Sequence, residues 1–308
     1  MRSFIASIRP DATPLLSSTL SKVLVAATLL VLPCSLVAQT AHFSGSVFTR
    51  GSGFGNPDGV AVDRSGNLFV ADQLNSAVYE LLAAGGYTTK ITLSTQFTVP
   101  TGIAVDGNEN VFVTDQGTAR VYEMLAAGGY TTANQLGSGF INPNGVAVDA
   151  SGNVFVADTN NHLVKEILAV NGSIPASNPT INTLAQTNGN FSSPASVAVD
   201  ANGNVFVADS GNSLVKEIVA AGGYVTVNIL GTGFSGDIGV ALDDSGNLFV
   251  ADSNHHVIKE LLAAGGYTTE STLDGVFNYP ADAAVDGRGN VFVSITWLAR
   301  FTRSCWAG

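Results

Sequence analysis

Short runs of alternating apolar and polar residues, separated by glycine-rich turns, fill most of the chain. The clearest example covers residues 142–167 and reads NPNGVAVDASGNVFVADTNNHLVKEI. Alternation with a period of two predicts β-strands, and the β-branched and aromatic residues favour the same structure. We therefore expect strands over 145–149, 153–158 and 163–169, and a fourth strand of the type TTANQLG, seen at 131–137.

The same pattern recurs six times at an almost constant spacing. The aspartate that ends the first strand recurs at intervals of 43, 43, 51, 43 and 43 residues, as Asp63, Asp106, Asp149, Asp200, Asp243 and Asp286. Four strands without a helix in about 43 residues are typical of one blade of a β-propeller. We place the repeats at about residues 56–97, 99–140, 142–191, 193–234, 236–277 and 279–303.

The two ends of the chain complement each other. The last copy provides strands at 281–286 and 290–295, and we expect a third over 298–303 but no fourth. The segment 42–50, before the first copy, has the pattern of an isolated fourth strand. We therefore predict an all-β fold, a six-bladed β-propeller of four-stranded antiparallel blades, in which the N-terminal strand completes the last blade. An open solenoid is the alternative.

The turn between the first and second strands contains a glycine in five copies, where a short hairpin needs a positive φ. The second copy has Glu109 at this place, so we expect a different turn there, built on Gly107 and Asn108. Aspartates and glutamates also recur at fixed positions of the copies. We interpret them as structural, because a residue that every blade carries serves the blade.

The motif P-x-G-V-A-V-D-x-x-G-N-V-F-V-A-D-x-x-N-H-L-V carries a family resemblance. It resembles the NHL-repeat family, and Asn161-His162-Leu163 spells the letters of that name. The resemblance covers residues 42 to about 303, although the sixth copy departs from the motif after Val293. It implies a propeller fold. Members of the family include protein- and RNA-binding modules, sensor domains of bacterial receptor kinases, and lyases or hydrolases, so the resemblance implies a scaffold and no single activity.

The first 38 residues do not follow the repeat. A basic segment precedes an apolar run at 23–38, which ends in the small residue Ala38 and is short for a membrane span. We predict a signal peptide over residues 1–38, with an uncleaved membrane anchor as the alternative. The mature propeller, residues 39–308, would then be secreted, periplasmic or at the cell surface.

The charge of the chain limits its partners. The formal net charge is −11, and the signal segment would take away three basic residues and one acid, which leaves −13. Repulsion therefore argues against binding to nucleic acid and against stable membrane insertion after cleavage of the signal. Cys305 would be the one cysteine left, so the mature chain forms no internal disulfide. We expect a monomer.

Residues that differ between copies are better candidates for a function than residues that recur. The loops before each first strand and after each second strand should open on the face that holds the mouth of the central channel. The candidate ligand-binding residues there are Asp58, Asn144, His162, Asp237, His255, His256 and Asp282. The oxygen-bearing members of this set suggest calcium, whereas a polar, solvated rim without a cofactor is the simpler interpretation. His162 and His255 belong to loops two blades apart, which argues against zinc.

No catalytic motif stands out, so the sequence favours a binding module over an enzyme. We predict a non-catalytic interaction module for a protein, peptide or glycan, acting through the channel-mouth face. A metal-assisted lyase or hydrolase at the same mouth is the alternative, and a structural cell-envelope protein is the second. The third copy is eight residues longer than the others, around 171–182, and residues 295–308 depart from the repeat, as a truncated or frameshifted end would.

Overall fold

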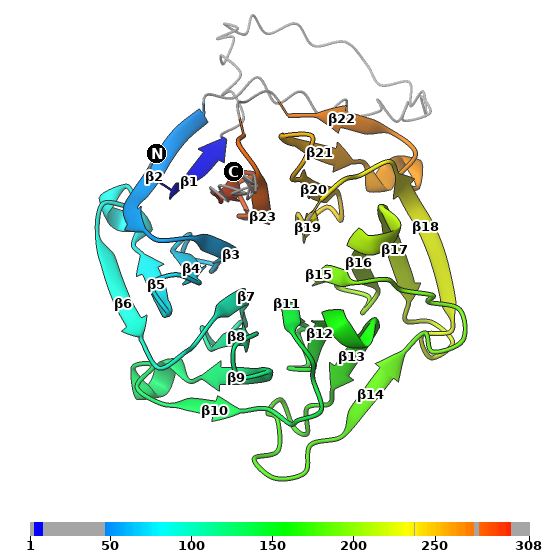
Figure 1. Cartoon of the computed structure of the whole chain (residues 1–308), viewed down its shortest axis with the longest axis horizontal. Coiled ribbons are helices and arrows are strands. Elements are labelled where there is room, and N and C mark those ends of the chain that lie inside the picture. The colour runs from blue at the N-terminus through cyan, green and yellow to red at the C-terminus, as the bar shows by residue number, and fades with distance from the viewer. Residues whose placement is uncertain (1–2, 9–46, 237, 274–276, 297–308) are drawn as a thin grey trace, which may run out of the picture.

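The structure, a computed structural model, describes residues 3–8, 47–236, 238–273 and 277–296. Within these residues, antiparallel sheets of four strands stand around a common axis, and Figure 1 shows the first strand of each sheet nearest the axis. The chain is therefore an all-β propeller. No helix in the described ranges is long and apolar enough to cross a membrane.

Five sheets are each built from four consecutive strands, and we call them blades 1 to 5. Blade 1 contains β3 (Pro57–Val62), β4 (Leu68–Asp72), β5 (Ala77–Leu81) and β6 (Lys90–Ser94). Blade 2 contains β7 (Pro100–Val105), β8 (Val111–Asp115), β9 (Arg120–Met124) and β10 (Ala133–Gln135). Blade 3 contains β11 (Pro143–Val148), β12 (Val154–Asp158), β13 (Leu163–Ile167) and β14 (Ile181–Leu184). Blade 4 contains β15 (Pro194–Val199), β16 (Val205–Asp209), β17 (Leu214–Val219) and β18 (Thr226–Thr232). Blade 5 contains β19 (Ile238–Leu242), β20 (Leu248–Asp252), β21 (Val257–Leu261) and β22 (Glu270–Thr272).

Single turns of 3-10 helix interrupt the loops of the blades. Three of them follow a third strand, namely η1 (Ala83–Gly85), η2 (Ala126–Gly128) and η5 (Ala263–Gly265). Two follow a second strand, namely η3 (Thr159–Asn161) and η4 (Ser210–Asn212). The fold therefore places short, irregular segments only at the two ends of the strands, where a site can be built without disturbing the sheets.

The sixth sheet combines strands from both ends of the chain, in the order β2-β1-β24-β23. Its inner strands are β23 (Pro280–Val285) and β24 (Val291–Ile295), and its outer strands are β1 (Ser3–Ile8) and β2 (Val47–Phe54). A segment before the first repeat thus forms the outermost strand, as expected, but it extends to Phe54, and residues 42–46 lie outside the described ranges.

The third strand of the sixth sheet differs from the expectation. β1, which belongs to the predicted signal segment, occupies this position and pairs with β24 from Phe4 opposite Ile295 to Ile8 opposite Val291. The segment 298–303, which we expected here, lies outside the described residues. The backbone of β24 offers the same ladder of N–H and C=O groups to any extended segment that reaches it, so the repeat pattern alone does not say which one pairs.

The core lies between neighbouring sheets. The second strand of every sheet is buried throughout, and each carries a phenylalanine that is at most 2% exposed: Phe69, Phe112, Phe155, Phe206, Phe249 and Phe292. Phe292 of the sixth sheet packs in one cluster with Val60 and Leu68 of blade 1. Because each blade has two apolar faces, a ring of blades hides surface that a single blade would expose.

Tyrosines on the loop after the third strand link blades 1, 2, 4 and 5 each to the preceding sheet. Their rings meet the core phenylalanine of that preceding sheet edge to face, at centroid distances of 5.4 Å (Tyr87 and Phe292), 6.4 Å (Tyr130 and Phe69), 6.4 Å (Tyr224 and Phe155) and 5.5 Å (Tyr267 and Phe206). The four tyrosines take positive φ angles between 60° and 67°. In blade 3, Ile174 packs in the cluster of Phe112 instead.

The repeated aspartates hold the loops in place. Asp149 Oδ1 accepts a hydrogen bond from Asn153 N at 2.9 Å, and its Oδ2 accepts one from Asn153 Nδ2 at 2.8 Å. Asp158, which is fully buried at the end of β12, accepts a hydrogen bond from Ile141 N at 2.7 Å and pairs with Lys165 Nζ at 2.6 Å. The structural interpretation of these carboxylates is therefore consistent with the bonds that they make.

The turn of blade 2 keeps the geometry of the other turns. Glu109 N donates to Asp106 O at 3.1 Å, as Gly152 N donates to Asp149 O at 3.0 Å, and Glu109 takes a φ of 66°. The expectation of a different turn built on Gly107 and Asn108 is wrong. A left-handed non-glycine residue costs roughly 1 kcal/mol or more, and the surrounding hydrogen bonds hold it there.

The additional residues of blade 3 lie in two places. Leu184 pairs with Val164, twenty positions earlier, whereas Leu136 bonds with Val121, fifteen positions earlier. Five extra residues therefore precede the fourth strand. The remaining three follow the fourth strand. Phe191 comes seven positions after Leu184 in blade 3, whereas Phe140 comes four positions after Leu136 in blade 2. Both insertions lie at the outer edge of the blade, away from the axis.

Candidate functional site

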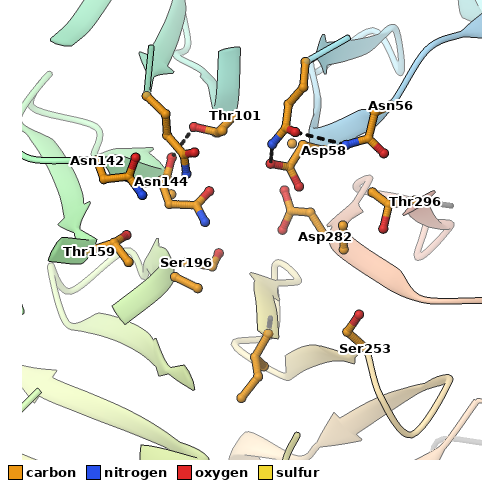
Figure 2. A pocket seen from close by; sticks show the side chains of 18 residues that line it. Asn56, Asp58, Thr101, Asn142, Asn144, Thr159, Ser196, Ser253, Asp282 and Thr296 are labelled. Carbon is orange, nitrogen blue, oxygen red and sulfur yellow. Dashed lines mark hydrogen bonds between the residues drawn. The ribbon is translucent and has the colours of Figure 1, made fainter. Parts of the chain in front are cut away.

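The loops before each first strand and after each second strand surround one end of the axis, which we call the channel mouth. A cavity of about 250 Å³ lies there and is lined by residues of all six sheets (Figure 2). Its polar lining consists of Asn56, Asp58, Gln73, Thr101, Gln116, Asn142, Asn144, Thr159, Ser196, Ser253, Asp282 and Thr296. No described lysine or arginine lines this cavity. Amide, hydroxyl and carboxyl groups therefore decide what can bind there.

Close contacts between first strands set the width of the channel. A Cβ atom on Gly59 would lie 2.3 Å from Thr101 O, and one on Gly102 would lie 2.2 Å from Asn144 O. Glycine at this position lets the backbone of one sheet touch the next. The residue just before each glycine, such as Asp58 in blade 1, then borders the cavity.

Two sheets have a polar side chain at this position instead of glycine. In blade 4, Ser196 Oγ accepts a hydrogen bond from Val240 N at 3.3 Å. In the sixth sheet, Asp282 Oδ2 accepts one from Val60 N at 3.1 Å. Each side chain thus bonds to a backbone amide of the following sheet, which the glycines of the other sheets cannot do, so the channel mouth is not symmetric.

Asp282 is a titratable group of the cavity with a strongly shifted pKa. Burial raises its pKa to about 8, nearby Asp58 adds to the rise, and hydrogen bonds from the backbone of Val60 and Ala283 oppose it. A carboxyl group with this pKa is largely protonated at neutral pH, so it can donate a hydrogen bond to a ligand. The cavity therefore combines a neutral acid with the other carboxyl group, Asp58.

A short chain of hydrogen bonds holds Asp58. Asn56 Nδ2 donates to Gln73 Oε1 at 3.0 Å, and Gln73 Nε2 donates to Asp58 Oδ2. On the other side of the seam, Ser294 Oγ donates to the backbone oxygen of Asp58. Figure 2 shows the carboxyl groups of Asp58 and Asp282 side by side at the seam between blade 1 and the sixth sheet.

The three histidines of the predicted site do not line the cavity. His162 Nδ1 accepts a hydrogen bond from Ser193 N at 2.9 Å, and His256 Nδ1 accepts one from Tyr279 N at 3.1 Å. Both residues take a positive φ, and both bonds lead to the next sheet along the chain. These histidines therefore connect neighbouring sheets.

His255 has a different structural role, because it contacts an aspartate of its own blade. Its Nδ1 lies 2.8 Å from Asp252 Oδ2, where the corresponding Asn161 of blade 3 donates to Asp158 Oδ2 at 2.7 Å. It thus takes the place of an asparagine that supports the buried aspartate.

Of the seven predicted residues, the structure brings Asp58, Asn144 and Asp282 together in the cavity, and Asp237 lies outside the described residues. Sequence reasoning missed Gln73, Gln116, Thr159 and Ser253, which also line it. Each of them directly follows the buried aspartate that ends a second strand, and this position varies between copies. That variation was the signal that could have identified them.

The arrangement of acidic groups gives little support for a metal. Among the described residues, no group of three or more His, Cys, Asp or Glu side chains is placed to hold an ion. Asp58 and Asp282 supply two carboxyl groups and Asn144 an amide oxygen, whereas calcium takes six to eight oxygen ligands. The calcium hypothesis would have to draw the remaining ligands from backbone oxygens and water.

A family model described as "NHL repeat" matches residues 140–167 and 191–218. These ranges cover the first three strands of blade 3 and of blade 4. No curated protein sequence matches the chain.

Solved structures share the fold at low sequence identity. A nidogen/laminin complex contains a chain that is 19% identical, with a TM-score of 0.62, and the alignment covers 81% of this chain and 89% of that one. A streptogramin B lyase is 10% identical, with a TM-score of 0.56 and coverage of 78% and 90%. An auxiliary nutrient binding protein from Bacteroides thetaiotaomicron is 13% identical, with a TM-score of 0.59 and coverage of 79% and 70%. At these identities the likeness shows the fold alone.

Proposed function

This chain belongs to the NHL-repeat β-propellers, and we propose that it is a non-catalytic binding module that recognises a protein, peptide or glycan at the channel mouth. One observation carries the proposal. The residues that line the mouth cavity differ from sheet to sheet, whereas the residues that recur are engaged in the hydrogen bonds of the fold. Blades with similar sequences thus present a polar surface at the channel mouth that differs from blade to blade.

The chemistry of the cavity agrees with a ligand rich in hydrogen-bonding groups. Amides such as Asn144 and Gln116 and hydroxyls such as Thr159 can donate and accept, and Asp282 can donate while it is protonated. A neutral or positively charged ligand meets no repulsion here. Peptides and glycans both meet this description. Structural neighbours named as a nutrient binding protein and as part of a nidogen/laminin complex support a binding function by analogy.

We further propose that the sixth sheet closes the ring as a sixth blade. β23 packs against both β19 of blade 5 and β3 of blade 1. Val60 N and the backbone oxygen of Asp58 form hydrogen bonds with Asp282 and Ser294 across this seam. Closure matters for the site, because it brings the two carboxyl groups of the cavity together from opposite ends of the chain.

We also propose that the chain is exported and acts as a monomer in a secreted, periplasmic or cell-surface setting. The proposal rests on the sequence of residues 1–38 and on the net charge of −11, which opposes binding to nucleic acid or to anionic membranes. Removal of residues 1–38 would also remove β1. The mature chain would then need another strand beside β24.

The binding proposal predicts that a bulky residue in the mouth abolishes ligand recognition. The full chain and the variant Asn144→Trp would be applied to arrays of peptides and glycans. We expect the strongest signal of the wild type to fall at least tenfold in Asn144→Trp, because an indole ring would fill much of the cavity. Asn202→Trp, on an exposed turn of the opposite face, is the control and should bind as the wild type does. Equal binding by Asn144→Trp would place the site elsewhere.

A lyase or hydrolase remains the second candidate because Asp58 and Asp282 form a pair. A carboxyl group that is protonated at neutral pH, such as Asp282, can act as a general acid, and Asp58 supplies a second carboxyl group in the same cavity. Solved lyases share the fold, and one variant with a histidine replaced by alanine is named as catalytically inactive. The described histidines of this chain lie outside the cavity. Mass spectrometry of the captured ligand decides: an unchanged ligand supports the binding module, and a cleaved one supports the enzyme.

A further inference from the structure

The face opposite the channel mouth carries a second cavity, of about 460 Å³, which we call the seam cavity. It lies between blade 1 and the sixth sheet, at the turns that join their first and second strands. Arg64 and Ser65 border it from blade 1, and Asp286 and Arg288 border it from the sixth sheet. Tyr87 of blade 1 also lines the cavity.

The two arginines interrupt a pattern that holds in the other turns. The two positions after the turn aspartate are neutral or acidic in blades 2 to 5, where they read Gly107-Asn108, Ala150-Ser151, Ala201-Asn202 and Asp244-Ser245. Only blade 1 and the sixth sheet have a basic residue there. These two sheets are neighbours, so residues that are 224 positions apart in sequence come to border one cavity.

Both guanidinium groups are free of partners within the described part of the chain. Each described lysine has a partner: Lys90 donates to Gly53 O, and Lys165, Lys216 and Lys259 pair with Asp158, Asp209 and Glu270. Among the described basic side chains, Arg64, Arg120 and Arg288 take part in no ion pair or hydrogen bond. Two of these three exposed cations therefore border the same cavity, on a protein of net charge −11.

The acids of this region form no ion pair with the two arginines in the described part of the chain. Asp286 accepts hydrogen bonds from Arg288 N at 3.0 Å, from Asn290 N at 2.8 Å and from Asn290 Nδ2 at 2.6 Å, so its oxygens hold the turn. Asp63 holds the turn of blade 1 in the same way. Asp244 lies beyond Gly287, on the side of blade 5, and limits the positive region there.

Two guanidinium groups near the seam cavity also contact neighbouring elements. The guanidinium of Arg64 lies along the turn of blade 2, where a Cβ on Gly107 would be 3.0 Å from its Nη2. The guanidinium of Arg50, in β2 of the sixth sheet, lies 5.6 Å from the ring centre of Tyr87. Of these groups, Arg64 borders the seam cavity from blade 1 and Arg288 borders it from the sixth sheet, whereas Arg50 is not part of its lining.

We propose that the seam cavity binds an anion that carries carboxylate or phosphate groups. The guanidinium fork of arginine matches both groups with two parallel hydrogen bonds, and the Ser65 hydroxyl adds a donor. The overall negative charge of the chain repels anions in general, so binding depends on this local pair of arginines. The site lies on the face opposite the channel mouth and is independent of the proposed function.

The test is calorimetric titration of the full chain with citrate and with pyrophosphate at low ionic strength. The variants Arg64→Ala and Arg288→Asn introduce residues that other blades carry in the same turn, at Ala150 and Asn202, and should therefore preserve the fold. We expect saturable binding of at least one anion and a loss of at least tenfold in affinity in the double variant. Arg120→Gln, on β9 of blade 2, is the matched control and should change the affinity less than twofold.

The two anions distinguish the source of the ligand. Binding of citrate alone indicates a carboxylate ligand, binding of pyrophosphate alone a phosphate ligand, and binding of both a site for either group. The proposal is overturned if neither anion binds saturably, or if the double variant binds as tightly as the wild type. Asn144→Trp should leave this binding unchanged, so failure here and failure of the channel-mouth proposal are separate outcomes.

Discussion

At the scale of single residues, the site depends on where one copy departs from the others. Glycine at positions such as Gly59 and Gly102 brings first strands into contact, and its replacement by Asp282 inserts a carboxyl group into that contact. A residue of this kind gives one seam a chemistry that the other seams lack.

Asp282 should make stability depend on pH. Its pKa of about 8 in the folded chain lies above the ordinary value of 3.8, so the folded state binds the proton more tightly than the unfolded state. The resulting stabilisation is complete below about pH 4 and is lost as the pH rises through 8. We expect Asp282→Asn to be more stable than the wild type at pH 9, by about 5 kcal/mol at most, and to lose this advantage towards pH 4.

Denaturant unfolding at several pH values measures this difference. Asp244→Asn, which changes an exposed aspartate in a turn, is the control and should follow the wild type at every pH. A constant difference between Asp282→Asn and the wild type from pH 4 to 9 would contradict the raised pKa.

At the scale of the elements, the loop after the third strand does more than connect two strands. In blade 5 the ring of Tyr267 packs against Phe206 of blade 4, and its hydroxyl donates to Gly246 O at 3.1 Å. The half-buried ring offsets the cost of its positive φ of 62°. Loops of this type therefore hold neighbouring sheets together.

Replacement of this tyrosine should loosen the joint between blades 4 and 5. We expect Tyr267→Ala to lower the free energy of unfolding by about 3 kcal/mol, because the ring leaves a cavity beside Phe206. Tyr267→Phe keeps the ring and loses one hydrogen bond, so it should cost about 1 kcal/mol. Thermal and denaturant unfolding would measure both variants. Equal losses in the two would show that the hydroxyl, and not the ring, makes the link.

At the scale of the whole molecule, the sixth sheet decides whether the ring is closed. β1 lies between β24 and β2 and pairs with both, so it is an inner strand of that sheet. The strand belongs to a segment whose sequence predicts a signal peptide. The full chain and a chain that lacks residues 1–38 should therefore differ at this sheet.

A proline in β1 tests this arrangement. Ala6 lies opposite Val293 on one side and Thr49 on the other, and an inner strand does not accommodate proline. We expect Ala6→Pro to destabilise the full chain by about 3 kcal/mol, through lost and unsatisfied backbone groups, which lowers the melting temperature by roughly 10 °C. Ala6→Val, which favours a strand, is the control. An unchanged melting temperature in Ala6→Pro would show that β1 does not form this sheet in solution.

Much of the architecture follows from local sequence. The alternation in NVFVAD predicts the second strands, and the period of about 43 residues predicts the blades. A repeated segment with two apolar faces can bury both faces only against neighbouring copies of itself. The structural part of Asp149 and Asp158 also follows from their recurrence. Variation between copies also selected Asp58, Asn144 and Asp282, which border the mouth cavity. A residue that every blade requires recurs in every copy, so a residue that varies is not needed for the fold of the blade.

Only the tertiary structure decided which residues meet. His162 and His256 differ from the residues of other copies, as a ligand-binding residue would, but their left-handed backbone turns them onto amides of the next sheet. The pairing of β1 with β24, the approach of Asp58 to Asp282 and the place of Arg64 and Arg288 on one cavity all involve segments that are more than 200 positions apart. These contacts form within the sixth sheet or where it packs against blade 1. A pattern that is local along the chain carries no information about which distant strands lie side by side.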